Sequence, residues 1–105
     1  MSNMESNHIA FSCALTTPEL QKRKATIINQ LKLILIEREE LPDGYSYKFK
    51  NTDEVIDILA NFVKIERQCC SFFDFNLVVR NNQSAELRIT GELGVKEFLR
   101  IELEL

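Results

Sequence analysis

The side chains best suited to chemistry in this sequence are a carboxylate and the two adjacent cysteines that follow it. Cys69 and Cys70 come three and four residues after Glu66, in a segment with helical periodicity. Residues at positions i, i+3 and i+4 share one turn of a helix, so the carboxylate and both sulfurs can converge. Cys13, which precedes the first predicted helix, is the third candidate thiol. Because thiolates select soft ions such as Zn(II), Cu(I) and, by extension, Hg(II) or As(III), these residues predict a metal site.

Glu66 occupies an unusual position on its helix. At about 100° per residue it falls in the middle of an apolar stripe, which also contains Leu59 and Phe62. A buried carboxylate without compensation is costly, so Glu66 requires a cation, a hydrogen-bond donor or a metal nearby. The most direct cationic partner in the first helix is Arg23, and Lys24 is the other candidate.

The cysteines also have a purely structural interpretation. Cysteine is among the most often buried residue types, and a free cysteine packs as a small hydrophobic side chain. On this interpretation Cys13, Cys69 and Cys70 contribute only packing. The protein would then be a non-catalytic, homodimeric structural or regulatory module.

Standard catalytic machinery is not indicated. A cysteine nucleophile needs a histidine or another base, and His8, the single histidine, lies near the beginning of the chain. With three glycines the sequence has no phosphate-binding glycine loop, and no Ser-His-Asp set can be drawn from it. We therefore predict no catalytic and no cofactor-binding residues, and a non-enzymatic role is favoured.

Composition excludes several classes of partner. The chain has 105 residues and a net charge of −3, so it has no basic surplus with which to neutralise a nucleic acid backbone. Its longest apolar run, over residues 33–36, is far too short to span a bilayer. The first seven residues are polar and contain Glu5 rather than the basic start of a signal peptide. We predict a cytoplasmic protein that binds neither nucleic acid nor membrane.

The first half of the chain has the pattern of a helix followed by a β-hairpin. Residues 1–7 are small and polar, so we predict a disordered N-terminus and a single domain over residues 8–105. The first helix begins at Thr16 or Thr17, with Pro18 in its first turn. We expect one strand over residues 33–40 and a turn over 41–44. A second strand follows over 45–49, where aromatic and polar residues alternate.

The second half repeats this order. Thr52 or Asp53 caps a second helix that runs to about Ser71, and a hairpin follows with strands over 75–79 and 85–89. Residues 95–105 fit a helix or a strand, and we favour a helix. Short hairpin connections imply a four-stranded antiparallel sheet with one apolar face, covered by two helices. The predicted fold is an α+β two-layer sandwich with the order α-β-β-α-β-β plus a terminal helix.

A second buried surface is suggested by apolar residues on the other face of the predicted strands. Ile34, Ile36 and Val78 fall on that face. Exposed β-branched residues of this kind, together with the leucine-rich terminal segment, indicate an interface with another molecule. A homodimer would supply it.

Several segments resemble a family of small bacterial proteins. Members carry a Cys-x-Leu segment before the first helix, a Glu-Arg-x-Cys-Cys-Pro-Phe segment and a glycine-rich segment before a final helix. Some are joined to, or encoded near, mercury-type transcriptional regulators, and no established activity accompanies the resemblance. Ser71 and Glu92 stand where the family tends to have proline. The similar residues, within about 13–100, are Cys13-Ala14-Leu15, Glu19, Arg23, Asp43-Gly44-Tyr45, Glu66-Arg67-Gln68-Cys69-Cys70, Phe72, Phe75, Gly91 and Lys96-Glu97-Phe98-Leu99.

The resemblance favours the metal interpretation of the cysteines. We therefore expect a thiol-based site for a soft heavy metal or metalloid (Zn, Hg or As) that serves resistance or sensing. Its ligands would be Cys13, Cys69 and Cys70, with Glu66 as a supporting carboxylate or proton acceptor. Arg67 stands off the apolar stripe, so we give it a surface role.

Overall fold

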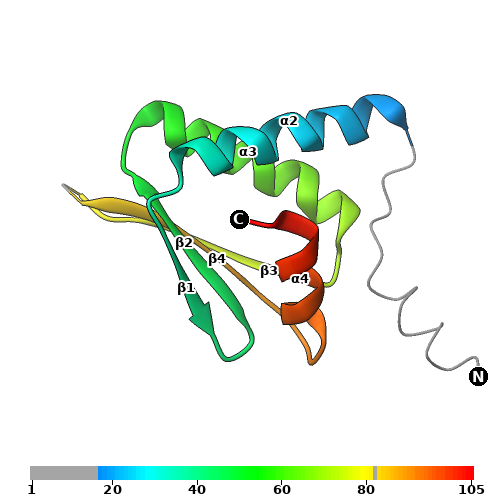
Figure 1. Ribbon diagram of the computed structural model, residues 1–105. Coiled ribbons are helices and arrows are strands. Elements are labelled where there is room, and N and C mark those ends of the chain that lie inside the picture. Colours follow the sequence, from blue (N-terminus) through cyan, green and yellow to red (C-terminus); the bar gives the residue numbers. More distant parts are fainter. Residues whose placement is uncertain (1–16, 82) are drawn as a thin grey trace, which may run out of the picture.

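The computed structural model describes residues 17–81 and 83–105. In this part of the chain three helices and four strands form an α+β fold, as predicted (Figure 1). The predicted disordered segment 1–7, His8 and Cys13 lie outside the described residues. The elements are α2 (Pro18–Ile34), β1 (Glu37–Leu41), β2 (Gly44–Lys50), α3 (Asp53–Cys69), β3 (Asp74–Val79), β4 (Ser84–Thr90) and α4 (Val95–Leu103).

The strands form one antiparallel sheet in the order β1-β2-β4-β3. Its two central strands present one apolar face, because Tyr45 pairs with Ile89, and Tyr47 with Leu87. These four side chains are buried, which confirms the alternation seen in the sequence. The other face is polar and carries ion pairs such as that between Arg88 and Glu86. The core therefore lies on the helical side of the sheet.

The helices begin where the sequence provides caps. The side chains of Thr17 and Thr52 accept hydrogen bonds from the backbone N–H groups of Leu20 and Val55, at the starts of α2 and α3. These bonds satisfy N–H groups that have no partner within the helix. Helices α2 and α3 pack side by side over the sheet (Figure 1). None of the helices in the described part of the chain has both the length and the apolar character needed to cross a membrane.

The terminal helix is confirmed, and it joins the same core. Val95, Leu99 and Leu103 of α4 are buried among the apolar side chains of the sheet and of the other helices. Phe98 of α4 and Phe72, which follows α3, meet edge to face with their ring centroids 5.4 Å apart. Helix α4 therefore closes the end of the layer at which α3 terminates.

The strand predicted over residues 33–40 is wrong in its first half. Helix α2 continues to Ile34, and its cap, Leu35, donates its backbone N–H to the carbonyl of Leu31. Leu31 is fully buried, so core packing extends the helix over residues whose β propensity favours a strand. Ile36 lies between α2 and β1. Because Ile34 is on a helix, the predicted dimer surface of Ile34, Ile36 and Val78 is not one face of a sheet.

Gly44 is required by the close approach of β2 and β4. A Cβ atom at this position would lie 1.9 Å from the backbone oxygen of Ile89, far inside van der Waals contact. Both strands therefore come together at a point where only glycine fits.

Candidate functional site

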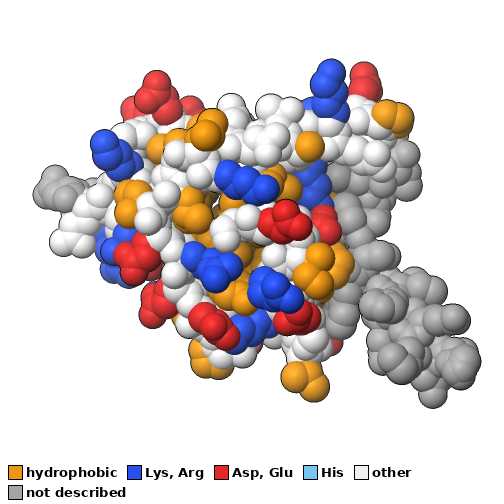
Figure 2. Space-filling view, in the orientation of Figure 1, with side chains coloured by type: hydrophobic (Ala, Val, Ile, Leu, Met, Phe, Trp, Pro, Cys, Tyr) orange, Lys and Arg blue, Asp and Glu red, His pale blue; other side chains and the backbone are white. Residues whose placement is uncertain are grey.

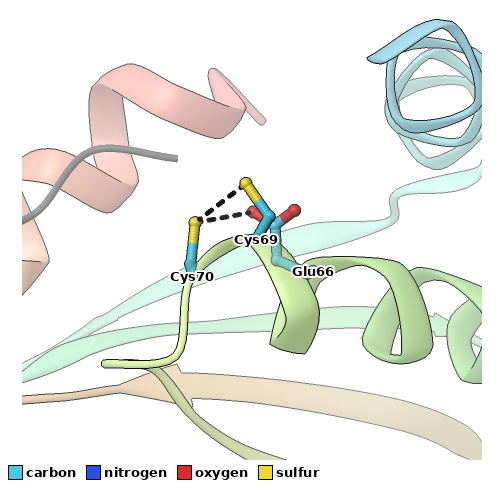
Figure 3. A group of neighbouring side chains, drawn as sticks. All are labelled: Glu66, Cys69 and Cys70. Atoms are coloured by element: carbon cyan, nitrogen blue, oxygen red, sulfur yellow. Dashed lines mark hydrogen bonds between the residues drawn. The ribbon is translucent and has the colours of Figure 1, made fainter. Parts of the chain in front are cut away.

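The cluster predicted from the sequence lies in the last turn of α3 and at its cap. The ligand atoms of Glu66, Cys69 and Cys70 all lie within 4.8 Å of one another, and all three residues are buried. The two Sγ atoms are 3.5 Å apart, and the Cys70 Sγ lies 3.9 Å from the Glu66 Oε2 (Figure 3). The helix thus brings the carboxylate and both sulfurs to one point. Cys13 lies outside the described residues.

The cation beside Glu66 is Lys24, and the prediction that favoured Arg23 is wrong. The Lys24 Nζ lies 3.3 Å from the Glu66 Oε1 and donates a hydrogen bond to the Cys69 Sγ over 3.4 Å. Arg23 is exposed, because one residue along a helix turns the side chain by about 100°. Lys24 lies on the buried side of α2, next to the cysteine end of α3.

Glu102 of α4 is a further member of the cluster, and sequence reasoning missed it. It forms a hydrogen-bonded ion pair with Lys24. The sequence contains a signal for its position, because Glu102 stands between Leu99 and Leu103, two buried residues of one helix face. Lys24 likewise precedes the buried Leu31 by two turns. Each helix therefore contributes one charged residue at a position that its periodicity marks as apolar.

Burial controls the ionisation of Glu66. Loss of water raises the pKa of this carboxyl group, and the positive charge of Lys24 only partly opposes the rise. Although the ammonium is near, Oε1 has no hydrogen-bond partner among the described residues. A buried oxygen without a hydrogen bond lowers the free energy of unfolding. Glu66 is therefore ready to accept a proton or a cation.

The Cys70 thiol is held in its neutral form. Burial, followed by the negative charge of Glu66, raises its pKa to about 12. At neutral pH the thiol therefore donates a hydrogen bond to the carboxylate rather than acting as a nucleophile. Burial alone would lower the pKa of Lys24, but its hydrogen bond to Glu102 and the charge of Glu66 outweigh burial and raise it. Lys24 therefore remains an ammonium.

A second charged region lines a solvent-open groove of about 830 Å³ between the β1-β2 hairpin and α4. Arg38 and Lys96 lie over the ring of Tyr45, at 5.1 and 5.8 Å from its centroid. Lys96 also pairs with Glu40 across the groove. Figure 2 shows basic and acidic side chains intermingled around apolar surface. Since both signs of charge line it, the groove does not favour an anionic or a cationic ligand.

Comparison with known proteins assigns no family to the chain. No family model matches it, and no curated protein or solved structure gives a significant match. Its chemistry is therefore argued from the side chains alone. Cys69 is disulfide-bonded in the structure, whereas Cys70 is a free thiol. Once Cys69 is reduced, its sulfur, the Cys70 thiol and the Glu66 carboxylate, all buried, can together take up a soft cation.

Proposed function

We propose that the reduced protein binds a soft metal or metalloid ion, such as Hg(II), As(III) or Zn(II), in resistance or sensing. The ligands are the sulfurs of Cys69 and Cys70, with Glu66 as the supporting carboxylate. The observation that carries the proposal is the convergence of their ligand atoms within 4.8 Å in a buried cluster. Sulfur donors favour soft ions over hard ones such as Mg²⁺ or Ca²⁺.

Lys24 acts in this proposal as the cation that an incoming ion replaces. Its ammonium contacts Glu66 and the Cys69 sulfur, which are the atoms that an ion would need. An ion at that point repels the ammonium. Glu102, already paired with Lys24, gives the ammonium a second carboxylate to hold it. The ammonium thus stays in the cluster on Glu102, and the charge of the ion is compensated by the two thiols, which lose their protons on binding.

Binding must also remove a proton from Cys70. The thiolate is the form that ligates metals, and the pKa of Cys70 is about 12. Ion binding to the reduced protein should therefore release the thiol protons of both Cys69 and Cys70, and the affinity should rise with pH. Glu66, 3.9 Å from the Cys70 Sγ, is the nearest carboxylate that can accept the proton as it leaves.

Cys13 is our proposed third thiol ligand. A site with two thiolates and one carboxylate falls short of the four ligands of a structural zinc site. Cys13 precedes α2 by five residues, and α2 carries Lys24 into the cluster. A third sulfur would complete the coordination of the ion.

A titration of the reduced protein tests the proposal. Hg(II), As(III) or Zn(II) should raise the Tm and produce a thiolate-to-metal absorption band, because an ion that binds only the folded state stabilises it. Mg²⁺ serves as the hard-ion control and should do neither. Both signals should disappear in the double variant Cys69→Ser, Cys70→Ser and should shrink in Cys13→Ser. Circular dichroism checks that each variant is folded.

An alternative is that the cysteines only pack the core. Complete burial and the neutral thiol of Cys70 favour this role. If all three soft ions act equally on the wild type and on the folded double variant, the metal proposal is rejected. The protein is then a structural or regulatory module.

A further inference from the structure

Strand β3 forms an edge of the sheet whose helical side is only partly covered. It is the last strand in the order β1-β2-β4-β3. Leu77 and Val79 lie opposite Leu87 and Ala85 of β4, which are fully buried. Even so, the side chains of Leu77 and Val79 remain 37% and 45% exposed. Apolar side chains on the core face of an edge strand are typical of a surface that another molecule covers.

The two edges of the sheet differ in character. Strand β1 has the sequence Glu-Arg-Glu-Glu-Leu, and charged residues of this kind protect an edge from pairing with another strand. Strand β3 has the sequence Asp-Phe-Asn-Leu-Val-Val, in which Asp74 is the only charged residue. Within residues 17–81 and 83–105 no strand pairs with the outer edge of β3, and its composition favours strand pairing more than that of β1 does.

The hydrogen-bond pattern identifies which backbone groups of β3 point outward. Arg80 donates its N–H to the carbonyl of Ser84, so this pair is of the hydrogen-bonded type in the β3-β4 register. In an antiparallel ladder the hydrogen-bonded pairs alternate with the others. Residues 74, 76 and 78 therefore also bond toward β4. The N–H and C=O groups of Phe75, Leu77 and Val79 point away from the sheet.

These outward groups match a second, antiparallel copy of β3. With a two-fold axis at Leu77, Phe75 stands opposite Val79 of the second copy, and Leu77 stands opposite its own equivalent. Each of these pairs uses only outward-pointing groups, so the new ladder needs no rearrangement of the β3-β4 hydrogen bonds. The same pairing places the exposed apolar side chains of both copies against one another on the core face.

Charge complementarity selects this register. Asp74 and Arg80 are both exposed, and they lie three residues on either side of Leu77. Around the axis, Asp74 of each copy therefore stands opposite Arg80 of the other. Arg80 also pairs with Glu86 of β4 on that polar face, and its five N–H donors can serve a second carboxylate. Moving the axis to a neighbouring residue separates Asp74 from Arg80.

We propose that two copies of the chain associate through β3 and join their sheets into one continuous antiparallel sheet. The interface combines backbone hydrogen bonds, the apolar contact of Leu77 and Val79, and two symmetry-related Asp74–Arg80 pairs. Of the surface of Ile34, Ile36 and Val78 that the sequence suggested, only Val78 belongs to β3, where it lies on the face opposite to Leu77 and Val79. The inference does not depend on the proposed metal site, because none of these residues belongs to that cluster.

Sedimentation equilibrium of the full chain at a range of concentrations tests the proposal. The variant Leu77→Lys places like charges opposite one another at the axis, and we expect it to weaken the dimer by at least about tenfold. Ile36→Lys is the matched control, because it puts the same side chain at an exposed isoleucine outside β3. It should leave the dissociation constant unchanged.

A charge reversal tests the register and does not require Leu77→Lys to fold. Asp74→Arg alone and Arg80→Asp alone should each weaken the dimer several-fold, and the double variant should restore it. Recovery in the double variant supports the proposal. A wild type that stays monomeric, an Ile36→Lys effect as large as that of Leu77→Lys, or a folded double variant without recovery would each overturn it.

Discussion

Helix α4 contributes to two clusters of charge that have opposite surroundings. On the buried side of α4, Glu102 forms an ion pair with Lys24, which also contacts Glu66. The side chains of Glu102, Lys24 and Glu66 are 24%, 9% and 0% exposed. On its outer side Lys96 pairs with Glu40, and Arg100 pairs with Glu97, along the groove. Both clusters contain a lysine–glutamate pair, and the outer one adds the pair of Arg100 and Glu97. Water reaches Glu40, Glu97 and Arg100 but not Glu66.

This difference shifts the pKa of glutamate in opposite directions. A hydrogen bond from Arg100 lowers the pKa of Glu97, and a hydrogen bond from Lys96 lowers that of Glu40. Burial raises the pKa of Glu66, although Lys24 is beside it. In the groove the charged partner determines the direction of the pKa shift, whereas in the core the loss of hydration determines it. A nearby lysine therefore does not prevent burial from raising the pKa of Glu66.

Removing the buried cation, Lys24, should cause the largest loss of stability. The variant Lys24→Met leaves Glu66 and Glu102 without its charge, and we expect a loss of about 3 kcal/mol in the free energy of unfolding at neutral pH. The loss should shrink as the pH falls, because the raised pKa of Glu66 allows it to become neutral in the fold. Urea denaturation measures both effects.

The matched control for this prediction is the preceding residue. Arg23→Met removes a positive charge from the same helix, but at an exposed position, and should change the unfolding free energy by no more than about 0.5 kcal/mol. If Lys24→Met and Arg23→Met lowered the unfolding free energy equally, the buried ion pairs of Lys24 would stabilise the fold no more than an exposed charge does.

The second prediction concerns alkaline pH. The Cys70 thiol has a pKa of about 12 in the fold, against its ordinary 9.0, so between these values the unfolded chain binds fewer protons than the folded one. Stability should therefore fall as the pH rises through this range, by up to about 1.4 kcal/mol per pH unit for one thiol. Stability–pH curves of the wild type and Cys70→Ala measure the effect. The variant should show a shallower slope, and parallel curves would exclude the thiol as the cause.

The smallest change in stability is expected when the exposed pair of Arg100 and Glu97 on the outer side of α4 is broken. Arg100→Gln breaks the pair with Glu97, but both groups are exposed, and exposed pairs contribute little because water and salt screen them. We expect no measurable change in Tm at physiological salt. A destabilisation comparable with that of Lys24→Met would show that the distinction between the two sides of α4 is wrong.

The sequence predicted the sheet because its pattern is local. Tyr45, Tyr47 and Phe49 alternate with polar residues, and no other element competes for that pattern. The run Leu33-Ile34-Leu35-Ile36 was harder to assign, because a short apolar run fits a strand or the end of a helix equally well. The burial of Leu31 favours continuation of the helix to Ile34. This burial depends on tertiary packing, which cannot be read from the local sequence.

The candidate site was only half predictable for a related reason. Glu66 and the cysteines share one helical turn, so their convergence follows from spacing alone. Lys24 and Glu102 come from two other helices, and their meeting depends on how the three helices cross. The periodicity test that identified Glu66 would also have marked Lys24 and Glu102 as charged residues on apolar faces. The periodicity of each helix does not show that Lys24 and Glu102 contact one another.

Lys24 and Glu102 lie 78 residues apart in the sequence, so they leave the ribosome at different times. At translation rates of about 5–20 residues per second, Glu102 emerges roughly 4–16 s after Lys24. During that interval α2 and α3 can meet, with Glu66 but not yet Glu102 beside the lysine. The apolar surface that α4 later covers, which includes Phe72, stays open to chaperones and to misassembly until α4 emerges. The nascent domain therefore completes its core only after its last helix has been made.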